Sequence, residues 1–275
     1  SAIIPLRYNG GMYGLPETQS FPMMFYRKDI MSDLDLEIPK TWDDLIIVIS
    51  ELEKNNMYFG LQQGAEAYGI MLHQNNGSFY KENAYLSNLT TEEAVKAFEE
   101  WTGLYVNYKI PLQFDFVTRF RVGEMPLAIV DFGMFNSLQV TAPEIRGDWD
   151  FAPVPGRMNE DGTIDRSVMS SGSAVMMMAN TKNPKLSWEF MKWWTSDEIQ
   201  LRYGRELEAV LGTSARYPTA NLNAFKSLPW SINDYSKISS QRNHAKGMPS
   251  VPGGYFIFRH LENAFRKTEY FRYYY

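Results

Sequence analysis

A repeated alternation of short apolar runs with longer amphipathic segments constrains this chain more than any other feature of its sequence. Residues 22–26 form an apolar run of strand length, and residues 126–130 and 150–155 form two more. Elsewhere, apolar residues recur at every third or fourth position, which is the spacing of a helix with one buried face. Strands that alternate with helices of this length predict an α/β layered fold.

Residues that favour helix starts precede the amphipathic segments. Thr41 and Asp44 have the spacing of a capping box, in which each side chain accepts a hydrogen bond from the backbone of the other residue. Residues 90–93 repeat this device before a second helix. Asn and Pro begin a third helix over residues 183–203, and a last helix is expected from about residue 254 to residue 270.

Three shorter segments complete the expected layout. Residues 173–179 are mostly apolar and predict another buried strand, with the methionines at 176–178 packed inside it. Residues 159–162 predict a turn, because Asp-Gly favours positive φ. Residues 236–253 form the most loop-like stretch, and we assign no element to them.

The composition argues against several classes of protein. The formal net charge of −5 comes from 32 acidic and 27 basic residues, and the basic residues are scattered, so nucleic acid is not an expected partner. The chain has no cysteine, and its three histidines have no nearby partner at metal-ligand spacing. No apolar run approaches the roughly 20 residues that cross a bilayer. We therefore expect no metal, no cofactor and no membrane span.

The sequence favours binding over catalysis. It contains no GxGxxG, GxxxxGK[ST] or GxSxG, so dinucleotide, P-loop and α/β-hydrolase chemistry lack their usual signatures. Aromatic residues make up 15% of the chain, and many of them stand beside Gly, Pro, Ser or Asn, which places them in loops. Aromatic rings together with amides, carboxylates or Arg can bind a polar organic ligand that also has apolar faces.

Short segments spread along the chain match one family in the same order. They are Leu15-Pro16, residues 24–29 (MFYRKD), 39–45 (PKTWDDL), 120–128 (FRVGEMPLA), 150–156 (DFAPVPG), 171–174 (SGSA) and 188–198 (WEFMKWWTSDE). Together they resemble the family 1 extracellular solute-binding proteins of ABC transporters, the group that contains maltose-binding protein. Residues 251–255 (VPGGY) are most similar to the large Gram-positive lipoprotein branch of that family.

The resemblance implies a periplasmic-binding-protein type II fold with a ligand cleft between two lobes. By analogy, residues 1–19 are the hinge crossing, residues 20–170 belong to the carboxy-terminal lobe, and residues 171–215 return to the amino-terminal lobe. Residues 216–275 then complete the carboxy-terminal lobe with the final helix. Members normally carry a further lobe before residue 13, so the resemblance also implies that an amino-terminal portion is missing.

The same resemblance implies a function and a location. The chain is expected to be the extracellular solute-binding subunit of an ABC importer that captures a carbohydrate, most simply an oligosaccharide, and delivers it to the membrane permease subunits. The full-length protein is expected to be lipid-anchored at the cell surface, or periplasmic in a Gram-negative cell. It is not expected to be an enzyme.

Candidate ligand contacts lie at the ends of the predicted strands and in the loops that follow them. Polar side chains there can bind hydroxyls and aromatic ones can stack on a sugar face, and the family's cleft contacts generally come from the same segments. The predicted ligand-binding residues are Glu17, Gln19, Phe21, Gln62, Gln63, Asp131, Phe132, Phe135, Ser171, Gly172, Ser173, Arg216, Tyr217, Trp230 and Tyr255. Trp230 follows Pro and Tyr255 follows Gly-Gly, so we expect these two rings to stack on the ligand.

Other functions remain open at this point. A glycan-acting hydrolase could use a carboxylate pair such as Glu17 and Asp131 as acid and base. The solute could also be something other than a sugar, or this chain could be a folded fragment that binds nothing.

The helix with Trp188, Trp193 and Trp194 is aromatic on more than one face. We therefore expect an exposed or self-associating apolar surface around residues 171–215. With one wall of the cleft missing, we also expect weaker ligand binding than in a complete protein.

Overall fold

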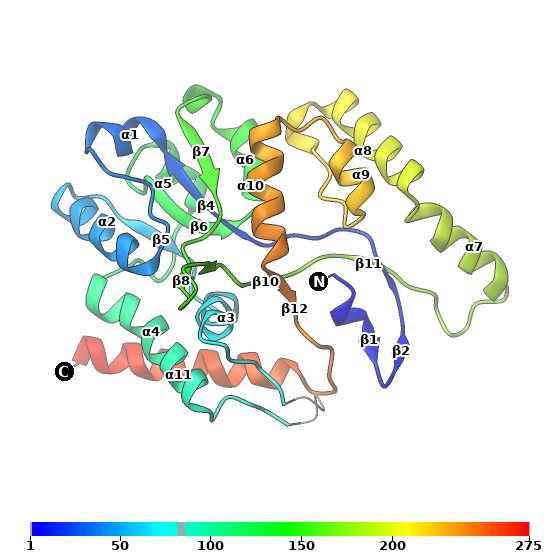
Figure 1. Ribbon diagram of the computed structural model, residues 1–275, viewed down its shortest axis with the longest axis horizontal. Coiled ribbons are helices and arrows are strands. Elements are labelled where there is room, and N and C mark those ends of the chain that lie inside the picture. Colours follow the sequence, from blue (N-terminus) through cyan, green and yellow to red (C-terminus); the bar gives the residue numbers. More distant parts are fainter. Residues whose placement is uncertain (1, 82–85, 275) are drawn as a thin grey trace. The chain divides into compact units, whose positions relative to one another are not determined.

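The computed structural model describes the backbone of residues 2–81 and 86–274, and side chains up to residue 268 with the same gap. Contacts divide the chain into two compact units (Figure 1). Unit 1 comprises Ser1–Phe21, Asp131–Pro143 and Ser170–Ser250, and unit 2 comprises Pro22–Val130, Glu144–Met169 and Val251–Tyr275. The lobe boundary expected between residues 170 and 171 thus falls one residue from a unit boundary. Residues 131–143 and 216–250 are grouped in unit 1 with residues 1–21 and 170–215.

A mixed four-stranded sheet forms the centre of unit 2. Its strand order is β5 (Phe59–Leu61), β6 (Leu127–Asp131), β4 (Pro22–Arg27) and β7 (Trp149–Ala152). β4 runs antiparallel to β7, and β5 runs parallel to β6. Met23, Met24 and Phe25 are 0% exposed, so this strand is covered on both faces, which explains its unbroken apolar sequence. The three strands predicted over residues 22–26, 126–130 and 150–155 are confirmed, although β7 ends at Ala152.

Helices cover this sheet, and their starts follow the predicted signals. They are α1 (Lys28–Asp33), α2 (Trp42–Lys54), α3 (Ala65–Gln74), α4 (Glu92–Tyr108), α5 (Phe116–Arg121) and α11 (Tyr255–Tyr274). The Thr41 side chain accepts a hydrogen bond from the Asp44 backbone, and the Asp44 carboxylate accepts one from the Thr41 backbone. Thr91 caps α4 in the first of these two ways. The capping box at Thr41 and the last helix are confirmed, whereas residues 90–93 provide only the single cap of Thr91 and no reciprocal capping box.

The core of unit 2 continues from the sheet into an aromatic layer between helices. Trp101 of α4 is 0% exposed and stacks on Phe265 of α11, with ring centroids 4.3 Å apart. Tyr68 of α3 contacts Trp101 with its ring, and its buried hydroxyl donates to the Ala94 carbonyl. These contacts dock the last helix on α3 and α4 (Figure 1).

Short elements complete unit 2. They are β8 (Arg157–Met158), β9 (Ile164–Asp165), η2 (Pro143–Ile145) and β10 (Val168–Ser170); the first residue of η2 and the last residue of β10 belong to unit 1. The predicted turn over residues 159–162 is confirmed, because it joins β8 and β9 as an antiparallel pair. Gly162 has φ +81 there, a conformation that the Asp-Gly sequence favours.

Unit 1 contains only two-residue and three-residue strands and relies on helices. Its elements are η1 (Ile4–Leu6), β1 (Arg7–Tyr8), β2 (Gly11–Met12), β3 (Leu15–Pro16), α6 (Met134–Thr141), β11 (Ala174–Val175), α7 (Pro184–Trp194), α8 (Asp197–Leu211), η3 (Thr213–Ala215), α9 (Leu222–Ser227), α10 (Ile232–Asn243) and β12 (Ala245–Gly247). β1 pairs with β2, and β3 pairs with β11, both antiparallel.

Two sequence expectations for unit 1 are wrong, and a stretch to which we assign no element contains regular structure. The buried strand over residues 173–179 is only β11, and Met176, Met177 and Met178 are 58%, 42% and 72% exposed. The single helix over residues 183–203 is two helices, because Ser196 is extended (φ −69, ψ 155) between α7 and α8. The stretch 236–253 holds the second half of α10 and all of β12.

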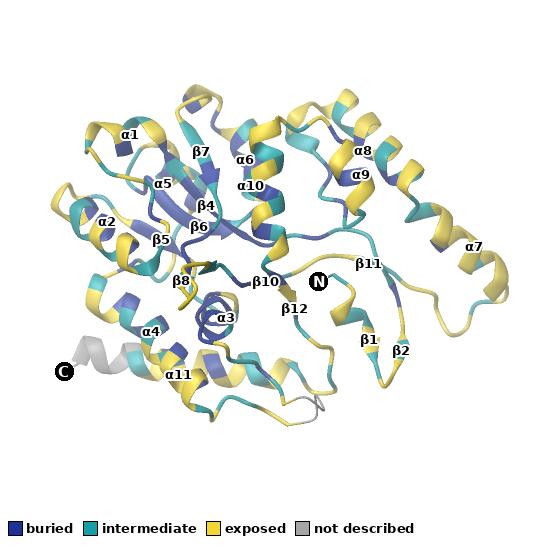
Figure 2. Cartoon of the chain, in the orientation of Figure 1, coloured by how far each residue is buried: buried dark blue, intermediate teal, exposed yellow. Residues whose placement is uncertain are grey.

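The α7 helix leaves most of its surface exposed (Figure 2). Among its described residues only Met191 is buried, whereas Trp188 is 41%, Phe190 54% and Trp193 50% exposed. This agrees with the expected exposed apolar surface around residues 171–215. Within the part of the chain that the structure describes, no helix is long and apolar enough to cross a membrane.

Candidate functional site

Most of the predicted ligand contacts come together in unit 1. Of the fifteen, Gln62, Gln63 and Tyr255 belong to unit 2, which leaves twelve in unit 1. These twelve form two neighbouring groups in the chain's fold: a polar strip on extended segments, and an aromatic cluster beside α6 and η3.

The polar strip is built on the extended segment of residues 17–20. On one side, Ser20 and Ser171 exchange two backbone hydrogen bonds of 2.9 Å, and the Glu17 N–H donates to the Ser173 carbonyl. On the other side, the Gln19 N–H donates to the Pro218 carbonyl at 2.9 Å. The three segments therefore hold the predicted residues Glu17, Gln19 and Ser171–Ser173 in one short sheet-like layer.

Gly172 permits this layer to form. A Cβ atom at this position would lie 2.1 Å from the Thr18 carbonyl oxygen, far inside van der Waals contact. The backbone bonds of Ser171 and Ser173 draw the chain close to residues 18–20. Glycine is thus required by close backbone approach, and the role of Gly172 in this structure is to shape the strip.

Glu17 is fixed as a hydrogen-bond acceptor. Its carboxylate accepts a bond of 2.8 Å from the indole N–H of Trp194 and one of 3.1 Å from the Ser173 hydroxyl. The Ser173 hydroxyl also lies 2.8 Å from the Thr18 hydroxyl. Glu17 is half-buried and Ser173 is exposed, so the strip presents oriented oxygen atoms at the surface of unit 1.

Asp131 lies at the end of β6 and is fixed in a similar way. One carboxylate oxygen accepts bonds of 2.8 Å from the Ser20 hydroxyl and 2.7 Å from the Gly133 backbone N–H. These bonds leave the second oxygen of this half-buried carboxylate with no partner in the described structure. It can accept a hydrogen bond from a ligand hydroxyl.

The aromatic cluster includes Phe132, which directly follows Asp131 in the chain. Phe132 stacks on Phe135 and on Phe21, with centroids 5.7 Å and 6.3 Å apart, and Trp230 contacts Phe132 and Phe135 at 5.9 Å and 5.8 Å. Phe21, Phe132 and Phe135 are 1%, 5% and 7% exposed, whereas Trp230 is half-buried. The phenylalanines therefore support the cluster from inside, and Trp230 is its partly accessible ring.

Arg216 joins the cluster to α8. Its guanidinium carbon lies 4.5 Å from the centroid of Trp230, and its side chain pairs with Glu208 through two hydrogen bonds. The two side chains are only 9% and 12% exposed. Arg216 therefore orients Trp230 by a cation–π contact, while its charge is compensated by Glu208.

The remaining predicted residues of unit 1 are buried. Gln19 is 5% exposed and Tyr217 is 9% exposed. Burial raises the pKa of the Tyr217 hydroxyl, and the negative charge of Glu17 raises it further. Tyr217 thus stays protonated at neutral pH and can act only as a neutral hydrogen-bonding group.

Sequence analysis missed Arg242 of α10. Its guanidinium lies 3.9 Å over the Phe225 ring and 6.0 Å from Phe21, and burial lowers its pKa to about 10. A local signal for α10 was present, because Ser231 caps it by accepting from the Asp234 backbone N–H. The contact itself joins residues far apart in sequence and has no local signature.

The three predicted contacts in unit 2 do not form one group. Gln62 is exposed directly after β5, and Tyr255 is 64% exposed at the start of α11, where it packs on Phe256. Gln63 lines a small hollow of about 120 Å³ beside Trp101 and Phe265.

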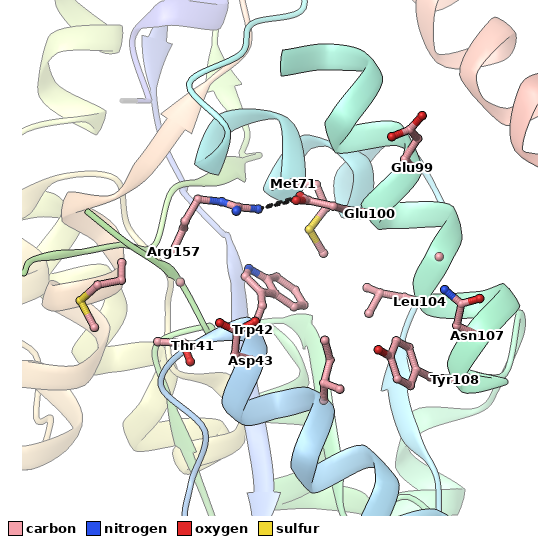
Figure 3. A pocket seen from close by; sticks show the side chains of 14 residues that line it. Thr41, Trp42, Asp43, Met71, Glu99, Glu100, Leu104, Asn107, Tyr108 and Arg157 are labelled. Carbon is pink, nitrogen blue, oxygen red and sulfur yellow. Dashed lines mark hydrogen bonds and ion pairs between the residues drawn. The ribbon is translucent and has the colours of Figure 1, made fainter. Parts of the chain in front are cut away.

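Unit 2 also has a pocket of about 420 Å³ that contains none of the fifteen predicted residues (Figure 3). A volume alone does not identify a solute site, and the gathering of twelve independently predicted residues carries more weight. We therefore treat the polar strip and aromatic cluster of unit 1 as the candidate functional site.

The geometry of this site suits binding of a polar molecule that carries hydrogen-bond donors. Glu17 and Asp131 accept hydrogen bonds, the exposed serines both donate and accept, and Trp230 offers part of an aromatic face. Comparison with protein families decides the class. The model of the family "bacterial extracellular solute-binding protein" matches residues 2–201. The chain belongs to this family. It is a family of binding proteins rather than of enzymes.

Solved structures show the same fold at low sequence identity. An ABC transporter solute-binding protein from Thermotoga lettingae, bound with α-D-tagatose, is 20% identical with a TM-score of 0.74, over 95% of this chain and 68% of that one. An ABC substrate-binding protein from Listeria monocytogenes in complex with cycloalternan is 18% identical with a TM-score of 0.75, over 97% and 69%. The sugar-binding protein MalE from Xanthomonas citri is 17% identical with a TM-score of 0.74, over 98% and 68%.

These similarities confirm the mixed α/β, periplasmic-binding-protein fold, of which this chain spans about two thirds of each neighbour's length. Among curated proteins no match was found.

Proposed function

We propose that this member of the family captures a carbohydrate outside the cell and delivers it to the permease of an ABC importer. The observation that carries the proposal is the single site in unit 1 where oriented carboxylates, exposed serines and a partly accessible tryptophan meet. A sugar needs such a combination of hydrogen-bonding groups and an aromatic surface. The sugar ligands named for the structural neighbours support the same class of solute.

Each part of the site has a role in this proposal. The free oxygen of Asp131 and the carboxylate of Glu17 accept hydrogen bonds from ligand hydroxyls. Ser171 and Ser173 donate and accept, and Trp230 stacks on a C–H face. The buried Phe21, Phe132 and Phe135, together with Arg216, hold Trp230 in place. Gln62, Gln63 and Tyr255 remain proposed contacts from unit 2.

Removing the Trp230 ring tests the proposal. The 275-residue protein is titrated calorimetrically with a panel that includes tagatose, maltotetraose and cycloalternan. For the sugar that binds, Trp230→Ala is expected to weaken affinity about thirtyfold, because a central aromatic anchor commonly contributes about 2 kcal/mol. Trp193→Ala, which removes a 50% exposed ring from α7, serves as the matched control and leaves affinity unchanged.

The second variant separates binding from folding. Trp230→Phe keeps a ring beside Arg216, so it is expected to fold and to lose affinity only partly. If both Trp230 variants fold and bind as tightly as the unchanged protein, Trp230 is not a ligand contact. If no sugar binds while an amino acid or another polar solute does, the family assignment stands and the carbohydrate proposal fails.

An assay for turnover distinguishes the proposed binding protein from the hydrolase alternative. Glu17 and Asp131 already accept hydrogen bonds from fixed donors, which suits acceptors and not a general acid. Incubation with oligosaccharides is therefore expected to release no new reducing ends. Sustained release that disappears in Glu17→Gln or Asp131→Asn would show that the protein is a hydrolase.

Lipid anchoring and membership of the large Gram-positive lipoprotein branch belong to the same proposal. Residues 251–255 are the segment that supports the branch assignment. Mass spectrometry of the protein isolated from membranes of its native cells tests the anchor. An acylated amino terminus is expected, and a protein found unmodified in the medium or periplasm contradicts it.

A further inference from the structure

The pocket of unit 2 is lined by residues from four elements and by none of the residues of the proposed sugar site. Its lining comes from the start of α2, the middle and end of α4, and the β8 segment, with Met71 from α3 (Figure 3). Its volume of about 420 Å³ falls in the range of small-molecule sites. All of its lining residues belong to unit 2, so its shape is fixed within one compact unit.

The wall of this pocket is apolar and held in place. Trp42, Ile46, Leu104 and Met71 line it, and the last two are only 5% and 3% exposed. The Trp42 indole N–H donates to the side-chain oxygen of Gln74 at 2.7 Å. Gln74 is 2% exposed, and its amide donates to two backbone carbonyls. The Trp42 ring therefore has a fixed orientation, with its polar edge engaged by the protein.

The charges around the pocket do not balance. Asp43, Glu99 and Glu100 carry three negative charges, and Arg157 is the one cationic residue among the lining residues that the structure describes. Arg157 pairs with Glu100 at 2.7 Å, and Glu100 also accepts from Asn75 at 2.7 Å. This pair neutralises itself (Figure 3). Asp43 and Glu99 then remain as two carboxylates with no ion pair among the described residues.

We propose that this pocket binds a small organic cation, an amine or guanidinium carried on a compact apolar body. The body fits against Trp42, Ile46 and Leu104, and the cationic head lies toward the rim, where the exposed carboxylates of Asp43 and Glu99 stand on opposite sides of the pocket (Figure 3). An aromatic wall beside carboxylates favours a cation through both Coulomb attraction and cation–π contact. A negatively charged ligand of the same shape is repelled by the same rim. The proposal concerns unit 2 alone and is independent of the sugar site.

Three ligands that share one body test the charge requirement. 2-Phenylethylamine, 2-phenylethanol and phenylacetate are titrated into the 275-residue protein and followed by saturation-transfer NMR and calorimetry. The amine is expected to bind with a dissociation constant of about 1 mM or tighter, a reasonable affinity for nine heavy atoms. The alcohol and the acid are expected to bind at least about tenfold more weakly. Equal binding of all three, or no binding of the amine, overturns the proposal.

Substitutions locate the binding. Asp43→Asn combined with Glu99→Gln is expected to weaken amine binding about tenfold or more, whereas Glu53→Gln, an exposed carboxylate on α2 outside the pocket, leaves it unchanged. Gly103→Leu fills the pocket from α4. A Cβ there meets only the Asn107 amide at 3.4 Å, so the helix tolerates the change.

Gly103→Leu is therefore expected to fold with an unchanged or higher melting temperature and to abolish amine binding. Amine binding that survives Gly103→Leu, or that is unaffected by the double carboxylate change, places the amine elsewhere and overturns the proposal. Sugar affinity measured on the same variants stays at its original value, so failure here is distinguishable from failure of the proposed function.

Discussion

Trp101 of unit 2 has a different environment from the tryptophans of unit 1. In unit 2, Trp101 is 0% exposed and stacks on Phe265 between α4 and α11. In unit 1, Trp188 and Trp193 of α7 are exposed, while Trp194 and Trp230 are half-buried and held by polar partners, Glu17 and Arg216. Unit 2 is thus organised by a sheet with helices packed on it, whereas unit 1 combines a small buried aromatic cluster with polar and cation–π contacts between short segments. Groups that can bind a polar solute are found where the side chains are only partly buried and remain accessible.

Removing a core ring has the largest expected effect. Trp101→Ala leaves a large cavity against Phe265 and Tyr68, so the free energy of unfolding is expected to fall by about 3–5 kcal/mol. Trp193→Ala on α7 removes a 50% exposed ring and is expected to change it by less than about 0.5 kcal/mol. Urea denaturation of both variants measures the difference. Similar losses would show that the α7 surface is covered in solution, for example by self-association.

The buried ion pair of unit 1 gives the next largest effect. Arg216→Met leaves the Glu208 carboxylate, 12% exposed, without its partner and removes the contact with Trp230. We expect a loss of about 3 kcal/mol in unfolding free energy, because an uncompensated buried charge is costly. The double change Arg216→Met with Glu208→Met is expected to recover part of this loss.

A second ion pair, on the helix α8 that carries Glu208, is the control for Arg216. Arg202 and Glu206 are 70% and 64% exposed, so Arg202→Met is expected to cost less than about 0.5 kcal/mol. If Arg216→Met costs no more than Arg202→Met in urea denaturation, unit 1 does not depend on its buried charge pair.

Two glycines, one in each unit, give effects of opposite sign. Gly172→Ala places a Cβ 2.1 Å from the Thr18 carbonyl oxygen, so segments 17–20 and 171–173 must separate, at a cost of about 1–3 kcal/mol. Gly103→Ala in α4 meets no atom closer than 3.4 Å and is expected to stabilise the protein by about 0.4–1 kcal/mol. Thermal and urea denaturation report both. A stabilising Gly172→Ala would mean that the strip is not close-packed in solution.

The sequence predicted the secondary structure of unit 2 better than that of unit 1, because the sequence signals for the strands and helices of unit 2 are local. The run Pro22–Arg27 is apolar and becomes a strand, since β6 and β7 pair with it on both sides. The run 173–179 is equally apolar but pairs with β3 over only two residues. Pairing ends there because the chain before Gly14 pairs elsewhere: the Tyr13 N–H donates to the Leu6 carbonyl instead. An apolar run shows a tendency to form a strand, and the availability of a partner decides the outcome.

The candidate site was predictable only in part for a related reason. Strand-end positions such as Asp131 and Glu17 could be recognised from the neighbouring apolar runs and from the family resemblance. The contacts that orient site residues are less local. Trp194, which donates to Glu17, lies 177 positions from it in the chain, and Arg216 lies 14 positions from Trp230. Arg242 was missed because its partners, Phe225 and Phe21, belong to other elements. Which aromatic rings are buried, as Phe21 is, also depends on such long-range packing.

The smallest expected effect is a pH dependence in unit 2, where charge contributes less than packing. Arg27 donates two hydrogen bonds to Asp29, and these lower the pKa of the Asp29 carboxyl below its ordinary value. A carboxyl whose pKa is lower in the folded state stabilises the fold above its unfolded pKa of about 3.9, and this stabilisation is lost as the pH falls through the folded value. Because Asp29 is 39% exposed, solvent limits the effect to about 1 kcal/mol. Urea denaturation is therefore expected to show Asp29→Asn less stable than the unchanged protein at pH 7, with the gap closing below pH 4, whereas Asp33→Asn on the same helix shows no such gap. A gap that stays constant from pH 7 to pH 3 would mean that the side chain acts through packing and that the ion pair contributes nothing.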